Sequence, residues 1–476
     1  MSSYLSKDFT ATPTNAKKFT FSCWFKTTEI GKNQPVLSNT NTGGNQFEIT
    51  GIRSDKKIGV IGYISGSVTH NHETNRLLLD STSWYHLVVA GDSTLSTSTD
   101  RLKIYLNGER LTSFSTATAI TQNNDYELNK EMSGTSNGFH VGANASGSNY
   151  FRGNIAHIHN VDGLAYAPTK FGEVDSTTGE WKPILAPSSV TYGNNGWFLK
   201  MENAGALGTD SSGNGTTFSL NGDLKQSPDT PSNNFCTLDN NQCQDTGNVR
   251  FGGTAYLSAS SSATGVASTQ MVKNGKWYFE VKIETDRTSA DGSTISIAKN
   301  GTHAQRRWRN SGANAIVGKE TGSNGCEGIT YQPMIGTPNL IDDGGGGTVN
   351  YGVQASAGNI IMMAVDLSGA TAKLWFGKNG TWFNAPGGSN VGVPHTGANP
   401  GLSFAKGDDF WGVNITSVNN ASDNANKHMF CNFGNGYFGV TAVSSGNADD
   451  NGVGIFEYDV PAGFFAICTK NIKTYG

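Results

Sequence analysis

The chain has 476 residues and a formal net charge of −4, with no block of like charges. Charge so weak and so evenly spread gives no electrostatic footprint for phosphate, so we expect no nucleic-acid partner. Only 36% of the residues are hydrophobic, but 24 Phe, 15 Tyr and 9 Trp are far more aromatic surface than a disordered segment carries. We therefore expect a compact fold.

Residues 1–18, MSSYLSKDFTATPTNAKK, lack the apolar core of a signal peptide. No run approaches the ~20 apolar residues that cross a bilayer. We expect synthesis in a cytoplasm and no membrane span. Cytoplasmic synthesis favours reduced thiols, and only Cys236 and Cys243 are close enough in sequence to suggest a disulfide.

Short strand-like runs follow one another along the whole chain, each rich in β-branched or aromatic residues and bounded by Gly, Asn, Asp or Pro. No window of a dozen residues sustains the apolar spacing of a helix without a Gly or Pro. The chain is therefore predicted to be all-β. In chain order the runs are FTFSCWF, GVIGYI, WYHLVVA, LKIYLNG, FHVGA, NIAHIHNV, GWFLKM, KWYFEVKI, NIIMMAVDL, KLWFGKNG, HMFCNFG, GIFEYDV and GFFAICT.

Asn-Gly steps supply the positive φ that two-residue hairpin turns require. The segments KIYLNG (103–108) and KLWFGKNGTWFN (373–384) each place an aromatic strand before such a step. In the second segment aromatic residues also follow the turn, so two strands are predicted to pair across Asn379-Gly380. An ordinary hairpin explains Trp382, and contact between its ring and a ligand is the alternative.

The segment KQSPDTPSNNF (225–235) interrupts the strand pattern with two prolines and small polar residues, as is typical of a linker. We predict one β-sandwich over residues 1–226, a linker over 227–234 and a second β-sandwich over 235–476.

A polar tract from Ser289 to Ala315 contains Arg306-Arg307-Trp308-Arg309, the densest positive charge in the chain. This cluster is interpreted either as a solvated loop tip or as an interface anchor. Trp411, in GDDFWG, has polar neighbours that indicate partial exposure, with a place in the core as the alternative. We predict that changing Trp308 or Trp411 to Ala leaves folding intact and weakens binding.

Four segments, in order, resemble the successive signature strands of laminin-G-like (concanavalin A-like) jelly-roll domains: FTFSCWFKT, SWYHLVVAGD, RLKIYLNGERL and YFRGNIAHIHNVDG. DSSGNG (210–215) also resembles a loop of that family. Laminin-G-like domains frequently bind calcium at loop tips, so the resemblance makes Asp210 and Asn214 candidate calcium ligands. A polar turn is the alternative for this loop and for ADDNG (448–452).

In the second half, GKWYFEVKI and GNIIMMAVDLSGATAKLWFGKNGTWFN resemble the opening and paired central strands of SPRY domains. HMFCNFG and YDVPAGFFAICTKN resemble the closing strands of SPRY-like modules in virion proteins. Both resemblances imply concanavalin A-like jelly-roll sandwiches, here in tandem. Together with the linker, the combination resembles structural proteins of tailed bacteriophages.

Glycoside hydrolases also occur on this fold, and they need two carboxylates flanking the scissile bond. The glucanases carry a Glu-x-Asp-x-x-Glu strand, whereas Glu457-Tyr458-Asp459 lacks the third acid. Glu127 and Glu131 stand without a middle acid. We therefore expect no catalytic residues.

The sequence has no Gly-x-Ser-x-Gly nucleophile elbow. The pairs His70/His72 and His157/His159 have no carboxylate or thiol at motif spacing. For His157/His159, a solvent-facing or inter-domain stripe and a His-x-His metal site both remain open. These patterns assign no cofactor, and calcium at Asp210 and Asn214 stays a candidate.

The resemblance implies a non-enzymatic virion structural protein, in a fibre or appendage, that contacts host-surface glycans or other virion proteins. The alternatives are a capsid decoration protein without a receptor role and a glycan-degrading tail enzyme. Association with phage appendages also implies a homo-oligomer, such as a trimer, although no heptad repeat is present.

Overall fold

The computed structural model describes residues 3–132, 138–185, 187, 189–243, 248–258, 264–284, 294–299, 328–333, 339–342, 347–417 and 427–476. Contacts divide the chain into two compact units. The N-terminal unit holds residues up to 226 together with 230–232, and the C-terminal unit holds 227–229 and 233–476. The segment predicted as a linker is thus shared between the two units.

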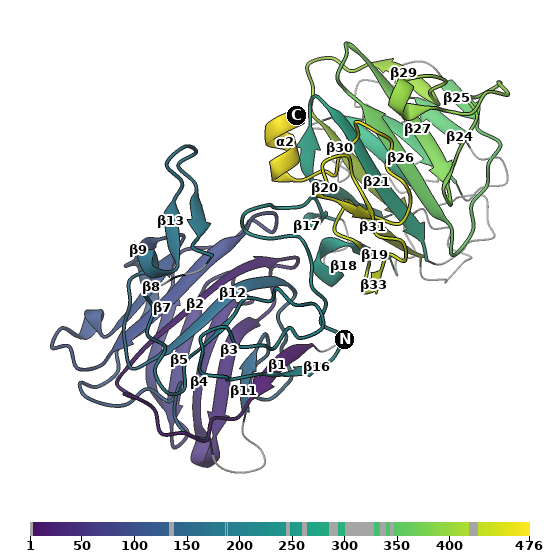
Figure 1. Cartoon of the computed structure of the whole chain (residues 1–476). Helices are drawn as coiled ribbons and strands as arrows, with labels where there is room; N and C mark the ends of the chain where they lie inside the picture. Colours follow the sequence, from purple (N-terminus) through teal and green to yellow (C-terminus); the bar gives the residue numbers. More distant parts are fainter. Residues whose placement is uncertain are drawn as a thin grey trace. The chain divides into compact units, whose positions relative to one another are not determined.

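The N-terminal unit is built from two large antiparallel sheets and one small hairpin (Figure 1). The eight-stranded sheet has the order β10 (Phe114–Thr118), β6 (Ser67–Thr74), β5 (Gly59–Ile64), β4 (Asn45–Ile52), β3 (Gln34–Asn41), β11 (Gly138–Val141), β1 (Tyr4–Lys7) and β16 (Ser219–Asn221). The six-stranded sheet has the order β15 (Trp197–Leu199), β12 (Gly153–Asp162), β2 (Lys18–Thr27), β7 (Tyr85–Asp92), β8 (Leu102–Leu106) and β9 (Glu109–Leu111). The hairpin pairs β13 (Gly172–Val174) with β14 (Trp181–Pro183), and the 3₁₀ turns are η1 (Thr42–Gly44), η2 (Ser98–Asp100) and η3 (Pro168–Lys170).

The C-terminal unit repeats this plan. Its seven-stranded sheet has the order β17 (Leu238–Cys243), β20 (Thr264–Val272), β30 (Trp411–Ser417), β22 (Thr294–Lys299), β23 (Gly328–Gln332), β24 (Asn339–Asp342) and β25 (Gly347–Asn350). The facing sheet has the order β18 (Val249–Arg250), β19 (Ala255–Ser258), β31 (Lys427–Asn432), β21 (Lys276–Ile283), β26 (Ile360–Asp366), β27 (Thr371–Lys378) and β28 (Thr381–Trp382), with β29 (Leu402–Ala405) also on β27. Smaller elements are the pairs β32 (Tyr437–Phe438) with β33 (Thr441–Ala442) and β34 (Asn447–Ala448) with β35 (Ile455–Phe456), and the turns η4 (Phe251–Gly253) and η5 (Pro394–Thr396).

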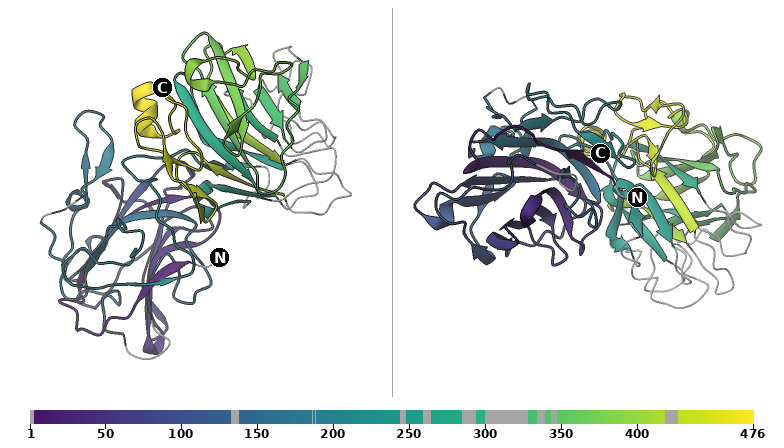
Figure 2. Two further views of the ribbon diagram at one scale, coloured as in Figure 1. Left: turned by 45° about the vertical axis from the view of Figure 1, so that its right-hand side comes forward. Right: turned by 90° about the horizontal axis from the view of Figure 1, so that it is seen from below.

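In each unit the two sheets share one apolar core, which makes the unit a β-sandwich (Figure 2). In the N-terminal unit, Phe21 of the six-stranded sheet and Phe139 of the eight-stranded sheet belong to the same buried cluster. In the C-terminal unit, Phe279 and Ile415 connect the two sheets in the same way. The prediction of an all-β chain with two sandwiches is therefore confirmed.

A second, smaller core lies on the outer face of one sheet in each unit. In the N-terminal unit, Val88 and Val161 pack with Phe171, Tyr192 and Phe198 from the segment that follows β12. Strand alternation places these side chains opposite the main core. One sheet of the unit is therefore buried on both faces.

The C-terminal unit buries the outer face of its β21 sheet in the same manner. Tyr278 and Trp375 point away from the main core and pack with Phe456 and Phe464 from the closing segment. A strand buried on both faces needs a nearly continuous run of buried residues. KWYFEVKI in β21 has that pattern.

The segments KIYLNG (103–108) and KLWFGKNG (373–380) end in the same type of turn. Asn107 and Asn379 both have φ near +50°, and each is followed by a glycine at positive φ, as a type I′ hairpin requires. The Asn107 side-chain oxygen accepts the amide of His86 at 2.8 Å, and the Asn379 oxygen accepts the amide of Ile360 at 2.8 Å. Each turn is therefore tied to the neighbouring central strand by its own asparagine.

The C-terminus departs from the predicted strand pattern. GFFAICT (463–469) forms isolated bridges, including Phe235 to Cys468, and the chain then continues as the helix α2 (Thr469–Tyr475). Seven residues are too few to show a helical period, so no local pattern predicted this helix. Among the described residues, no helix has the length and apolarity needed to cross a membrane.

Cys236 and Cys243 are buried and are not joined by a disulfide, so the pairing that their spacing allowed does not form. Both side chains belong to the core cluster of the C-terminal unit. Cys23 and Cys468 are also buried free thiols, as expected for small apolar residues inside the fold. Cys326 lies outside the described residues.

Four histidines, His70, His72, His86 and His159, are buried as neutral rings in the N-terminal unit. His70 contacts Tyr126 edge to face at 5.3 Å between ring centroids, and its Nε2 has no hydrogen-bond partner among the described residues. Burial lowers the pKa of His70 to about 3 and that of His86 to about 3. Burial also holds the pKa of His159 well below its usual value.

We predict that acidification destabilises the N-terminal unit well above the pH at which carboxylates titrate. The folded histidines stay neutral while the unfolded ones take up protons below pH ~6.5, so stability present above that pH is lost as the pH falls. Each such histidine lowers the free energy of unfolding by up to about 1.4 kcal/mol per pH unit. Thermal unfolding at pH 7.5 and pH 5.0 measures the effect.

His70→Phe should reduce this acid sensitivity, because an apolar ring suits the aromatic surroundings of His70. His395→Gln, at an exposed position, is the control and should leave the pH dependence as in the wild type. Equal melting temperatures at the two pH values in the wild type would contradict the prediction.

Candidate functional site

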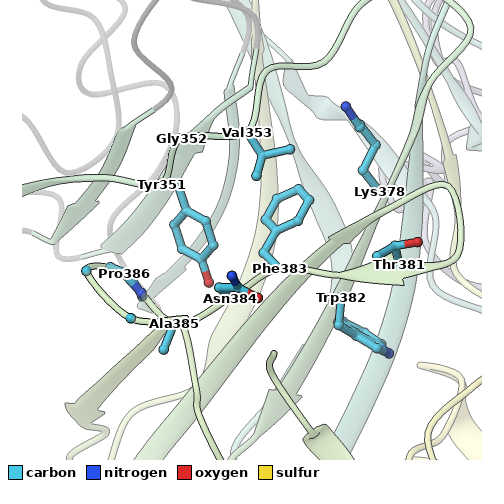
Figure 3. Close-up of a pocket in the computed structure, with 12 residues that line it drawn as sticks. Tyr351, Gly352, Val353, Lys378, Thr381, Trp382, Phe383, Asn384, Ala385 and Pro386 are labelled. Atoms are coloured by element: carbon cyan, nitrogen blue, oxygen red, sulfur yellow. The ribbon is translucent and has the colours of Figure 1, made fainter. Parts of the chain in front are cut away.

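An open pocket of about 440 Å³ lies in the C-terminal unit (Figure 3). Three segments supply it: the chain after β25, the end of β27 with its Asn-Gly turn, and the loop after β28. The lining residues are Tyr351, Gly352, Val353, Lys378, Thr381, Trp382, Phe383, Asn384, Ala385, Pro386, Gly387 and Gly388.

Tyr351 and Phe383 form the aromatic wall of this pocket. Their ring centroids are 5.4 Å apart at 56°. Tyr351 packs on Tyr331 and Phe376 of the main core and Phe383 packs on Tyr331, so that only 8% of Tyr351 and 6% of Phe383 is exposed. Figure 3 shows both rings and Val353 directed toward the same space. Because the wall is anchored in the core, a ligand would meet rings that are already ordered.

Trp382 borders the pocket, but its ring points away from the Tyr351 and Phe383 rings (Figure 3). It lies at 6.3 Å from the Tyr278 ring and joins the small outer-face cluster. Successive residues of an extended chain point to opposite faces, so Phe383 takes the pocket side. Trp382, the residue predicted from the sequence, therefore lies at the edge of the pocket, and its neighbour Phe383 lines the interior.

Lys378 places a cation at this pocket. Its Nζ donates a hydrogen bond of 2.8 Å to the Gln354 carbonyl oxygen. Thr381, on the other side of the Asn379-Gly380 turn, pairs with Lys378 and is exposed. The exposed Asn384 adds an amide that can both donate and accept.

Sequence reasoning missed Tyr351, Lys378 and Phe383 as site residues. Tyr351 and Phe383 lie some thirty positions apart and meet only through the pairing of distant strands, which no local pattern encodes. The Asn-Gly turn beside Lys378 was the available signal, because loops held by rigid sheets are where binding residues gather.

Trp411 is a core residue, so its predicted partial exposure is wrong. Its side chain is 4% exposed, lies 4.8 Å from the Phe404 ring and donates from Nε1 to the Lys406 carbonyl oxygen at 3.2 Å. The exposed ring of GDDFWG is Phe410, at 45%, with Lys273 Nζ 5.6 Å from its centroid. A shift of one residue along a strand exchanges the two faces. Trp308 lies outside the described residues.

The Asp210 carboxylate is occupied by protein donors. Oδ1 accepts the amides of Phe198 and Ser212, and Oδ2 accepts the Ser212 hydroxyl and the Thr216 amide, at distances of 2.8 to 3.0 Å. Asn214 donates to the carbonyls of Gly193 and Gly196. Four donors use the acceptor sites of one carboxylate, so this loop is ordered as a polar turn.

Asp449 has the same kind of role in the C-terminal unit. It is buried, and it accepts the amides of Val453, Gly454 and Ala466 and the side chain of Asn471. Within the described residues, no three His, Cys, Asp or Glu side chains come together in a way that could hold a metal ion.

His157 and His159 do not share a solvent-facing stripe. A register shift lies between Ala156 and His159, and His157 adopts φ of 46° within it. His159 is buried, stacks on Phe198 at 3.8 Å and bonds to the Tyr192 hydroxyl at 2.9 Å. The expected exposure is therefore wrong for His159, because the segment after β12 covers this face.

Ser22 and His86 form a buried pair with the geometry of a nucleophile and base, at 2.8 Å between Oγ and Nε2. The indole nitrogen of Trp181 donates to the other ring nitrogen, Nδ1, at 2.8 Å. An indole can only donate, so Nδ1 is the acceptor and the ring proton lies on Nε2. His86 therefore donates to Ser22 and cannot accept its proton as a general base.

Glu280 is a buried carboxylate whose pKa burial raises to about 7. Raised carboxyl pKa values occur in catalytic acids, so the residue must be weighed as one. Its Oε1 accepts from the Tyr278 hydroxyl and the Tyr458 amide, and its Oε2 from the Glu457 amide and Asn432. With no exposed face, it ties the closing segment to β21 and does not meet solvent.

A laminin-G-like family, described as the Concanavalin A-like lectin/glucanases superfamily, matches residues 3–163, about a third of the chain. This region of the N-terminal unit is therefore similar to a laminin-G-like, concanavalin A-like domain, as predicted. No curated protein matches the chain.

Solved structures give weaker likenesses. The SPRY domain of human HERC1 is 14% identical, with 41% of this chain and 96% of that chain covered and a TM-score of 0.27. Domains LG4-5 of the mouse laminin alpha1 chain are 10% identical, covering 90% and 84%, also at 0.27. The heptameric SAP-like pentraxin from Limulus polyphemus is 13% identical, covering 35% and 71%, at 0.25. At such scores the fold of each unit is established by its own sheet order and shared core.

We predict that Trp411→Ala and Phe410→Ala change the free energy of unfolding by very different amounts, because Trp411 lies in the core and Phe410 at the surface. Trp411→Ala should lower the free energy of unfolding by about 3–5 kcal/mol, because a buried indole leaves a cavity. Phe410→Ala should change it by no more than about 0.5 kcal/mol, because the ring is exposed. Chemical denaturation of the two variants measures both values, and equal effects would contradict the assignment of faces.

Proposed function

We propose that this protein is a non-enzymatic adhesion protein that binds glycans through the pocket of its C-terminal unit. One observation carries the proposal: the aromatic wall of Tyr351 and Phe383 stands beside hydrogen-bonding groups from Lys378, Thr381 and Asn384. Apolar faces of sugar rings pack on aromatic side chains, and sugar hydroxyls need such polar partners. The lectin/glucanases match over residues 3–163 supports a glycan-binding role for the chain, although it lies in the N-terminal unit and does not include the pocket.

We propose that the protein is not an enzyme because neither Glu280 nor the Ser22–His86 pair is arranged for catalysis. Glu280 is enclosed by four donors, and the His86 tautomer faces Ser22 with a proton. Neither group is arranged to cleave a glycosidic bond, which requires two carboxyl groups facing the substrate. The pocket itself is lined by no carboxylate.

We further propose that the protein belongs to a phage virion, as a fibre or appendage component and a homo-oligomer such as a trimer, with other virion proteins as partners. The support is the resemblance of the tandem sandwiches and their linker to tailed-phage structural proteins. A capsid decoration protein and a glycan-degrading tail enzyme are the competing outcomes.

The glycan proposal predicts that the purified chain binds defined members of a glycan array. Tyr351→Leu should weaken that binding by about tenfold, equivalent to about 1.4 kcal/mol, because the flat wall is lost. Tyr351→Phe keeps the ring and is the matched control, and thermal unfolding of both variants verifies the fold. An array without hits would refute glycan binding, and release of oligosaccharide from host polysaccharide would refute the absence of catalysis.

The virion proposal predicts that antibody against the chain labels intact phage particles. Immunogold images should place label on fibres or appendages, and label over the capsid would instead support decoration. Unlabelled particles would count against a virion role. A mass measurement in solution that finds only monomer would count against self-assembly.

A further inference from the structure

Charge at the pocket points to the class of glycan that it takes. Of the twelve described residues that line it, Lys378 is the one that carries a charge, and no carboxylate lies among them. A concave site with a single sign of charge raises the local concentration of ligands of opposite charge.

Among the described residues Lys378 has no carboxylate partner, in contrast to four other lysines of the same unit. Lys273, Lys276, Lys282 and Lys299 each lie within 4 Å of an Asp or Glu oxygen. In the part of the chain that the structure describes, no ion pair neutralises Lys378. Its positive charge is therefore available to an anionic ligand.

The Lys378 ammonium is also held in position. It spends one N–H on the Gln354 carbonyl oxygen, and an ammonium has three donors, so two remain. The backbone beneath it is fixed by pairing with Thr381 and by the Asn379 side chain, which accepts the Ile360 amide. A preorganised cation loses little conformational entropy when it meets an anion.

We infer that the pocket takes an acidic saccharide, in which an anionic group binds Lys378 while the sugar ring packs on the wall of Tyr351 and Phe383. Figure 3 shows the arrangement: the lysine lies on one side of these rings and Pro386 on the other. This inference rests on the proposed glycan-binding function and specifies its ligand class.

The test compares carboxylated, sulfated and neutral saccharides on one array and then measures the hits by calorimetry. We expect the hits to be acidic, and the carboxylated and sulfated arms identify which anion is preferred. An oligogalacturonate and its methyl ester form a matched pair that differs only in charge. Affinity for the acidic member should fall as salt is raised, because screening weakens the contact with Lys378.

Variants separate this inference from the proposed function. Lys378→Met should weaken acidic ligands by about tenfold and neutral ligands, which lose one hydrogen-bond donor but no charge contact, by much less, whereas Tyr351→Leu should weaken both equally. Lys470→Gln, an exposed lysine on α2, removes the same charge elsewhere and should have no effect. Hits that are neutral only, or acidic binding that survives Lys378→Met, would overturn the acidic-saccharide assignment. Loss of the neutral hits on Tyr351→Leu would in that case still uphold the pocket as a glycan site.

Discussion

Burial of one sheet on both of its faces is the constraint from which the rest of each unit follows. The odd-numbered residues of β2 and β21 pack into the main cores, their even-numbered residues lie on the opposite, covered face, and the burial of both strands runs almost without interruption. Water is excluded from both sides, so every polar group on these strands needs a protein partner. Ser22 meets His86, and Glu280 meets four donors, for this reason. The Ser22–His86 pair and Glu280, which resemble catalytic groups, therefore serve to hold the covering segments on the outer face of each sheet.

The same constraint leaves binding to the turns and loops at the ends of the strands. The pocket is formed where β27 turns back into β28 and where the chain leaves β25, away from the buried face that holds Glu280. Its aromatic wall is continuous with the main core through Tyr331 and Phe376. The rigid sandwich therefore holds the pocket residues in place, and the residues of its turns and loops provide the groups that would contact a ligand.

Much of the fold could be predicted from local sequence, because strand and turn signals are local. The Asn-Gly steps at 107 and 379 form the turns that their residues require, and the aromatic runs before them are strands. The direction of individual side chains was harder to predict: Trp411 was expected to be partly exposed because its neighbours are polar, and only packing decides that it faces the core while Phe410 faces solvent. Asp210 was a candidate calcium ligand, with a polar turn as the alternative, because the sequence shows its oxygens but not the amides that reach them from Phe198 and Thr216. Tyr351 and Lys378 meet through long-range pairing, which one sequence does not reveal.

The Asn379-Gly380 turn also has a consequence for the chemical lifetime of the molecule. Asn-Gly is the step most open to deamidation, because glycine leaves its own amide unhindered for attack on the asparagine side chain. Here the side-chain oxygen is held by the Ile360 amide, and the backbone is fixed at φ of 50° and 84°. Conversion to isoaspartate would add an atom to the main chain and break the pairing of Lys378 with Thr381. We therefore expect the hydrogen bond that shapes this turn also to slow deamidation at the rim of the pocket.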